Sequence, residues 1–133
     1  MSSSWVTQVS GDPPLIGVAV GRRHRSHAFI EETGLFALNV VGERSRHLED
    51  YFYSPAAQRD DNLRDIPHEM HASGVPVLTE VATVLVCRVR DRLAAGDHTV
   101  FITAVEDVIE RPAEKPLTSQ DLEYVYVGTV IRR

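Results

Sequence analysis

Two apolar runs separated by a proline-containing turn open the chain. Residues Trp5–Val9 alternate between apolar and polar side chains, whereas Leu15–Val20 is continuously apolar. Alternation is typical of a strand with one buried face, and a short continuous run suits a strand that is covered on both faces. Between the two runs, Gly11–Pro14 predicts a turn, because a proline cannot donate a ladder hydrogen bond inside a central strand. The pattern predicts a hairpin-like pair of strands.

The next stretch changes to helical spacing. Ser26 suits the N-cap of a short helix that runs through Glu32 or Thr33 and ends at Gly34. A serine caps a helix by accepting a bond from a backbone N–H of the first turn, and glycine readily adopts the left-handed conformation that ends a helix. The apolar run Leu35–Val41 then predicts a third strand.

A second helix is predicted over Arg44–Tyr53. Its large apolar side chains recur at helical spacing, at Leu48, Tyr51 and Phe52. The following segment, Ser54–Ser73, is polar and interrupted by prolines, so it predicts a long surface loop. In a compact domain such a loop is usually functional or faces a partner.

The second half of the chain is predicted to be almost entirely β-structure. Two long apolar-rich runs, Glu80–Arg92 and His98–Glu110, are joined by the short turn Ala94–Asp97. A last strand is predicted over Tyr124–Ile131, after the loop Pro112–Gln120. Five or six antiparallel strands with two short helices indicate a mainly β domain, which we expect to close into a small barrel because closure hides the strand edges.

Composition and charge narrow the class of protein. The 133 residues are enough for one core, so we expect a single domain over residues 1–133. The net charge of −5 at pH 7 argues against nucleic acid or an anionic membrane as the main partner, because both require a basic face. No run approaches the roughly 20 apolar residues of a membrane span, and the first residues have no signal-peptide pattern. We therefore expect a cytoplasmic protein.

Two other sets of reactive side chains receive structural interpretations. His68 and His71 could share one face of a helix and bind zinc, but no cysteine or third ligand is placed to join them, so we expect no metal site. Cys87 lies in an apolar run without a basic neighbour, whereas a reactive thiolate needs an exposed, electropositive setting. We expect Cys87 to be a buried thiol in a reducing compartment.

The most informative polar feature is the basic segment Arg22–His27, which follows an apolar strand in an otherwise acidic chain. It holds three arginines, two histidines and Ser26. At the start of a helix such a segment suits an anion, because unpaired backbone N–H groups and the positive end of the helix dipole point to the same place. We expect a phosphate group there; the alternative is a solvated arginine-rich loop.

Four motifs in the same order resemble the flavin reductase-like family of FMN-binding split barrels. They are Ser4–Leu15, the Arg25-Ser26-His27 turn, Thr33–Val40 and Gly96–Phe101, and the resemblance extends from Ser4 to about Gly128. It implies an antiparallel Greek-key split β-barrel, usually a homodimer, that holds FMN or FAD in a groove near the dimer interface. It also implies an NAD(P)H-dependent flavin reductase, in which a hydride passes from the nicotinamide to the flavin.

The resemblance also implies roles for single residues. The segment from Ser4 onward would lie beside the isoalloxazine ring and ribityl chain, the basic segment would take the phosphate, and His98, the candidate catalytic residue, would contact the reduced nucleotide or the flavin face. The implied cofactor-binding residues are Ser4, Trp5, Val6, Thr7, Gln8, Arg22, His24, Arg25, Ser26 and His27. Because the two cofactors carry the chemistry, the protein has only to align them and exclude water.

Simpler interpretations remain open for several of these residues and for the whole protein. Trp5 could pack in the core or an interface, Thr7 and Gln8 could be exposed strand positions, and His98 could make an ordinary hydrogen bond at a strand end. The protein could be the reductase component of a two-component monooxygenase. It could also be a non-catalytic FMN-binding dimer module, or a flavin-dependent oxidoreductase that acts on another substrate.

The sequence differs from the family pattern at its beginning. Members of the family usually have another strand ahead of the segment that matches Ser4 onward. We therefore expect the barrel to lack its first strand, which would leave an edge of unpaired backbone groups. Such an edge favours pairing with a second copy of the chain.

Overall fold

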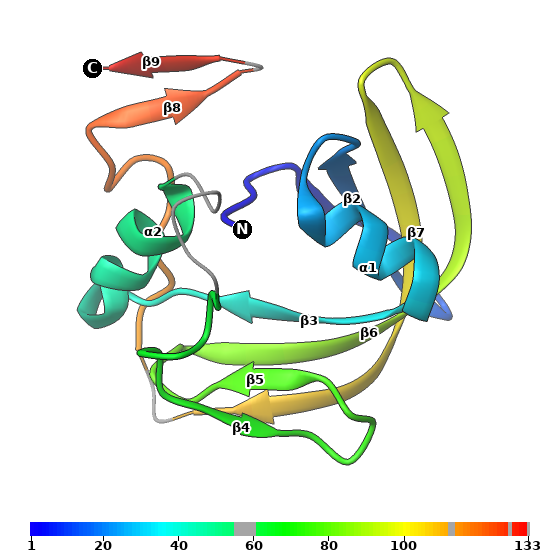
Figure 1. Cartoon of the computed structure of the whole chain (residues 1–133), viewed down its shortest axis with the longest axis horizontal. Helices are drawn as coiled ribbons and strands as arrows, with labels where there is room; N and C mark the ends of the chain where they lie inside the picture. The colour runs from blue at the N-terminus through cyan, green and yellow to red at the C-terminus, as the bar shows by residue number, and fades with distance from the viewer. Residues whose placement is uncertain (55–60, 112–113, 128, 133) are drawn as a thin grey trace.

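A five-stranded antiparallel sheet forms the centre of the computed structural model, which describes residues 1–54, 61–111, 114–127 and 129–132 (Figure 1). The strand order is β1-β2-β7-β6-β3. The bounds are Val6–Gly11 for β1, Pro14–Gly21 for β2, Leu35–Val40 for β3, Thr83–Ala95 for β6 and His98–Glu110 for β7. The expected mainly β, antiparallel architecture is confirmed. Closure into a barrel and a Greek-key order stay predictions.

The first two strands form the expected hairpin. Their turn lies at Asp12 and Pro13, and Pro14 is the first residue of β2, where a missing N–H is tolerated. Val6 of β1 pairs with Val18 of β2. Because β2 also pairs with β7, it is an interior strand, as its continuous apolar run indicated.

The β6–β7 hairpin brings a distant part of the chain to the end of β2. Ala95 and His98 are partners on either side of a two-residue turn, and Gly96 has φ 58°, a left-handed conformation that glycine adopts without strain. In the same sheet His98 pairs with Gly21. The first residue of β7 therefore lies opposite the residue that precedes the basic segment.

Helix α1 (Arg25–Thr33) begins earlier than its sequence suggested. Its N-cap is His24, which has extended backbone angles, so the expectation that Ser26 caps the helix is wrong. The reason is a backbone turn: the N–H of His24 donates to the carbonyl of Gly21 at 3.0 Å, and the helix starts directly afterwards. The C-cap prediction is confirmed, since Gly34 has φ 64° and donates its N–H to Ile30.

The remaining elements cover the ends of the sheet. Residues expected to form one helix give a single 3₁₀ turn, η1 (Glu43–Ser45), followed by α2 (Arg46–Tyr53). The expected surface loop 54–73 contains a short strand, β4 (His68–Met70), paired with β5 (Pro76–Leu78), while residues 55–60 lie outside the described part.

The C-terminal segment corrects another expectation. The strand predicted over Tyr124–Ile131 is instead an antiparallel hairpin of β8 (Tyr124–Tyr126) and β9 (Val130–Arg132). The chain reverses between them, where the N–H of Val127 donates a hydrogen bond to the carbonyl of Thr129. The hairpin contacts α2 through a hydrogen bond from the Tyr124 hydroxyl to Glu49.

Two groups of buried side chains form the core. One joins Ile30 of α1 to Val18, Val20 and Phe101 of the sheet, so α1 covers the part of the sheet that carries the basic segment. The other packs Leu48 of α2 against β5 and β6. Across the residues that the structure describes, no helix is both long and apolar enough to cross a membrane.

Candidate functional site

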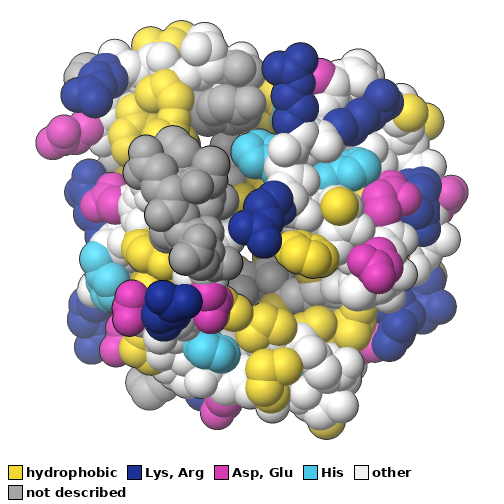
Figure 2. Space-filling view, viewed as in Figure 1, with side chains coloured by type: hydrophobic (Ala, Val, Ile, Leu, Met, Phe, Trp, Pro, Cys, Tyr) yellow, Lys and Arg dark blue, Asp and Glu magenta, His cyan; other side chains and the backbone are white. Residues whose placement is uncertain are grey.

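The basic segment forms the connection between β2 and α1. The N–H of Arg22 donates to the carbonyl of Asp97 at 3.0 Å, which ties the segment to the tip of the β6–β7 hairpin. In Figure 2, Lys, Arg and His side chains gather at the upper right of the visible face, where Figure 1 places the start of α1 and this hairpin tip. The cationic region therefore lies where two turns from distant parts of the sequence meet.

The arginines of this segment are exposed and lack carboxylate partners. Within the described ranges, Arg22, Arg23 and Arg25 form no ion pair, whereas Arg88 and Arg92 on β6 pair with glutamates. The N-cap of α1 makes no side-chain capping bond, and the first turn of α1 holds no acidic residue. Positive charge and free backbone N–H groups thus coincide, and this donor set fits an anion such as a phosphate.

His27 is anchored inside the protein. Its Nε2 lies 2.8 Å from Oγ1 of Thr99, a buried residue of β7. Its ring also packs against Phe101, with the ring centroids 5.6 Å apart. Glu31, one turn further along α1, lies 3.9 Å from the same nitrogen. These contacts hold the first turn of α1 against β7.

His98 is held from two sides at the start of β7. Its Nδ1 lies 2.7 Å from Oδ1 of Asp97, and its ring packs against the ring of Trp5 with the centroids 4.8 Å apart and the ring planes tilted by 43°. The bond to His98 and the charge of that imidazole lower the pKa of the Asp97 carboxyl. Only 13% of the His98 side chain is exposed. The imidazole therefore has a fixed position with little access to solvent.

Gly21 makes room for two imidazole rings. A Cβ at this position would lie 2.9 Å from Cδ2 of His24 and 3.6 Å from Nε2 of His98. The first distance is shorter than real Cβ contacts, so a side chain here would displace His24. The glycine thus allows His24 and His98 to approach the same point at the end of β2.

The candidate residues of β1 divide between two places. Trp5 lies with the histidines, whereas Thr7 pairs with Gly17, four residues before Gly21, or roughly 13 Å further along β2. Among the residues that the structure describes, the side chains of Thr7 and Gln8 form hydrogen bonds to carbonyl groups of β1 itself. They line a different, mostly apolar groove of about 450 Å³, together with Val6, Pro14, Leu15, Ile16, Leu38, Val40, Leu85 and Val105.

Comparison with known proteins identifies the family. The family model described as "Flavin reductase like domain" matches residues 1–128. The chain belongs to the flavin reductase-like family. It is 37% identical over 107 residues to a flavin reductase (NADH) of Kitasatospora aureofaciens, covering 79% of this chain and 54% of the relative. It is 31% identical over 102 residues to the reductase component of a 4-nitrophenol monooxygenase of Rhodococcus opacus, covering 77% and 53%.

The fold is also similar to that of solved flavin reductases. The NADH:FAD oxidoreductase of Streptomyces globisporus superposes with a TM-score of 0.79 at 24% identity, over 87% of this chain and 70% of that one. The chain spans only part of the length of the curated relatives that it matches, for example 18% of one and 58% of another.

In this flavin reductase-like domain, the structure brings together the implied residues Trp5, Arg22, His24 and His98 at one end of the sheet. Arg25, Ser26 and His27 follow in the first turn of α1. Ser4 is exposed in the segment just before β1. Thr7 and Gln8 lie apart, and Val6 lines the same groove as these two residues.

Sequence reasoning missed the residues that support the site. Asp97, Thr99 and Phe101 position His98 and His27, and none was among the candidate residues. Alternation in β7 could have indicated that Thr99 and Phe101 share the buried face, but their histidine partner lies far away in the sequence. The topology of β2 and β7 was needed to pair them.

The two other sets of reactive side chains have structural contacts. His68 lies in β4, so the helical face proposed for a histidine pair does not exist; His71 instead contacts Ser73 and Asp107. Among the residues that the structure places, no three potential ligand side chains gather as a metal site. Cys87 is fully buried, as expected, and burial raises the pKa of its thiol.

Proposed function

We propose that this flavin reductase-like protein is an NAD(P)H-dependent flavin reductase that transfers a hydride from the nicotinamide to FMN. The observation that supports this most directly is the cationic region at the start of α1. Its arginines form no ion pair with the carboxylates that the structure describes, and it adjoins the Trp5–His98 ring pair. A flavin phosphate would fit the cationic region, and the planar flavin ring would fit beside the rings of Trp5 and His98. The NADH-dependent reductase among the relatives supports the choice of reaction.

In this proposal the basic segment holds the phosphate. Arg25 and Ser26 at the start of α1, with the backbone N–H groups of its first turn, would bind the phosphate oxygens by charge-assisted hydrogen bonds. Ser4 and Trp5, which precede β1, would lie along the ribityl chain and ring. His27 keeps α1 in place through its contacts with Thr99 and Phe101.

His98 would act at the hydride donor. When bound, the flavin accepts a hydride at N5, and the protein supplies alignment and exclusion of water rather than a nucleophile. Asp97 accepts a hydrogen bond from Nδ1 of His98, which leaves Nε2 as the ring nitrogen for a ligand. Trp5 packs against this ring at a tilt of 43°, which restricts its rotation.

The wider proposal includes a partner and an assembly. We expect a cytoplasmic homodimer in which the curled sheet forms a split barrel and the flavin lies near the subunit boundary. A monooxygenase that consumes reduced flavin is a suitable partner, because one relative is the reductase component of such a system. The cofactor is FMN in this proposal, with FAD as the alternative.

A flavin-binding module without reductase activity is the second candidate. It is favoured by relatives in which the matching region is less than a fifth of the protein, so that the domain is one part of a larger molecule. Steady-state oxidation of NADH and NADPH, with and without added FMN, distinguishes the two. The reductase predicts nucleotide consumption that depends on both protein and FMN. Tight FMN binding without nucleotide oxidation would support the module instead.

A further inference from the structure

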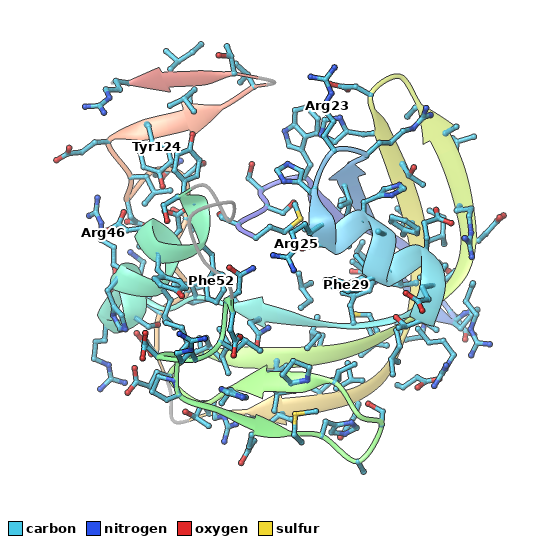
Figure 3. The ribbon with its side chains drawn as sticks, in the orientation of Figure 1. Arg23, Arg25, Phe29, Arg46, Phe52 and Tyr124 are labelled. Carbon is cyan, nitrogen blue, oxygen red and sulfur yellow. The ribbon has the colours of Figure 1, made fainter. Side chains whose placement is uncertain are left out.

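A serine, a histidine and an aspartate meet beside the turn of the β4–β5 hairpin, away from the cationic region. The hairpin lies at the bottom of the view in Figure 1, and the labelled side chains of Arg23 and Arg25 lie above it in the same orientation in Figure 3. Nδ1 of His71 lies 2.8 Å from Oγ of Ser73, and its Nε2 lies 3.0 Å from Oδ2 of Asp107 on β7. The imidazole therefore bridges a hydroxyl and a carboxylate.

The hydrogen bonds show which nitrogen of His71 carries the proton. The backbone N–H of Ser73 also lies at Nδ1, at 3.1 Å, and a backbone N–H can only donate. Nδ1 is therefore an acceptor without a proton of its own, so the hydroxyl of Ser73 donates to it as well. The proton of the neutral ring lies on Nε2, which donates to Asp107. A base that is to remove the serine proton needs this polarity.

The carboxylate and the histidine are both held in place. The other oxygen of Asp107, Oδ1, accepts a hydrogen bond from the backbone N–H of Val108 at 2.8 Å. The backbone N–H of His71 donates to the carbonyl of Val75 at 2.9 Å, and only 20% of the His71 side chain is exposed. The hydrogen bond from His71 is the main cause that lowers the pKa of the Asp107 carboxyl. A charged carboxylate at Nε2 stabilises the imidazolium that forms when Nδ1 takes up a proton.

Access to the hydroxyl distinguishes this cluster from the contact between His27 and Thr99. At His27 the hydroxyl of Thr99 and the carboxylate of Glu31 both lie at Nε2, and Thr99 is buried. At His71 the hydroxyl and the carboxylate lie at opposite nitrogens, and Ser73 is exposed in the turn. A dissolved reagent can therefore approach the hydroxyl of Ser73.

We propose that Ser73 is an activated nucleophile that accepts an acyl group from activated esters, with His71 as its general base and Asp107 as the residue that positions the ring. Oγ forms a bond to the carbonyl carbon, the bond from that carbon to the leaving-group oxygen breaks, and the serine proton passes to Nδ1 and then to solvent. The leaving group departs as a phenolate, so no oxidant or reductant is needed. Because the turn is exposed, small acyl groups on good leaving groups suit this site. The reaction requires neither flavin nor nicotinamide, so it is independent of the proposed reductase.

The test uses p-nitrophenyl acetate and the whole protein, without flavin or nucleotide. Peptide mapping by mass spectrometry locates the acetyl groups over time, and absorbance follows the release of p-nitrophenolate. Acetylation of Lys115, the only lysine of the chain, measures how much reagent each sample received. Thr99 is the internal control, because its hydroxyl contacts a histidine but is buried, and it should stay unmodified.

We expect Ser73 to be acetylated about tenfold faster, or more, than the other described serines and threonines. His71→Gln and Asp107→Asn should each lower that rate about tenfold or more and leave the acetylation of Lys115 unchanged. Ser73→Ala should remove the acetyl group from its peptide. Asp107→Asn keeps the size of the side chain, and thermal unfolding confirms that each variant is folded. A cluster that only stabilises the turn would not make Ser73 reactive.

Three results would overturn the inference. The first is an unmodified Ser73 in samples in which Lys115 is acetylated. The second is a rate at Ser73 that neither His71→Gln nor Asp107→Asn changes. The third is p-nitrophenolate release that persists in Ser73→Ala and is lost in His71→Gln, which would make the imidazole itself the nucleophile. A protein that acetylates Ser73 but does not oxidise NADH would refute the proposed reductase and retain this site.

Discussion

At the scale of single residues, the three histidines of the site have different environments. His27 is fixed to buried Thr99 and serves as an anchor, whereas His98 is bonded to an exposed carboxylate and stacked on Trp5. His24 is exposed and occupies space that exists only because residue 21 is glycine. The sequence alone does not distinguish these three histidines. Their different contacts follow from the register in which β2 pairs with β7.

The flavin phosphate is expected to contribute strongly to affinity. FMN should bind much more tightly than riboflavin, and Arg25→Ala should remove most of that difference. A charge-assisted hydrogen bond contributes about 1.5 to 3 kcal/mol, which corresponds to one to two decades in Kd. Fluorescence titration of both flavins against wild type and variant measures the effect. Equal affinity of the wild type for FMN and riboflavin would exclude the phosphate site.

The anchor of His27 should contribute to stability. Thr99→Val keeps the shape of the side chain but removes the hydroxyl that lies 2.8 Å from Nε2. A polar group left unpaired in a partly buried place costs about 1 to 3 kcal/mol. Denaturant unfolding should show a loss of about that size. A variant as stable as the wild type would mean that this hydrogen bond contributes nothing.

At the scale of elements, the sequence predicted which segments form strands and helices better than it predicted the residues at which they begin and end. The runs that became β1, β2, β6 and β7 were found because their apolar patterns are long and their turns contain glycine or proline. The start of α1 was predicted two residues too late, at an N-cap of Ser26 instead of His24, since serine is the better intrinsic cap. The backbone turn from Gly21 to His24 decides the helix start, and that turn depends on where β2 stops pairing with β7.

The C-terminus of α1 offers a direct test of backbone strain. Gly34→Ala adds a methyl group that meets no atom within 4 Å, so any cost arises from the left-handed backbone at φ 64°. We expect a loss of about 1 to 2 kcal/mol in unfolding free energy. The matched control is Gly11→Ala, where the space is equally open and φ is not in the left-handed range. A similar loss in both variants would contradict the strain argument.

At the scale of the whole molecule, the sheet ends at β1 and β3, and both strands line the apolar groove of about 450 Å³. Unpaired strand edges and apolar surface favour association. We expect a homodimer, which light scattering coupled to size-exclusion chromatography would measure. A monomer that reduces FMN would contradict both the dimer and its importance for the flavin site.

The family and the general architecture could be predicted from the sequence. The sequence could not show that the candidate residues of β1 lie in two different places. Four ordered motifs were sufficient for the family, and a family model confirms it. The sequence grouped Thr7 and Gln8 with Trp5 because they are neighbours in the chain. In the sheet they line another groove, because each residue of a strand adds roughly 3.3 Å and carries Thr7 and Gln8 away from the end of β2 where the histidines lie.

The most direct test of the reductase assignment is one round of flavin reduction without oxygen. The protein is mixed with one equivalent of FMN and an excess of NADH or NADPH, and the loss of oxidised-flavin absorbance is followed in wild type and in His98→Ala. We predict that the wild type bleaches the flavin far faster than a protein-free control. In His98→Ala the rate should fall while FMN affinity stays within a few fold. Bound FMN that remains oxidised in the wild type with both nucleotides would contradict the account.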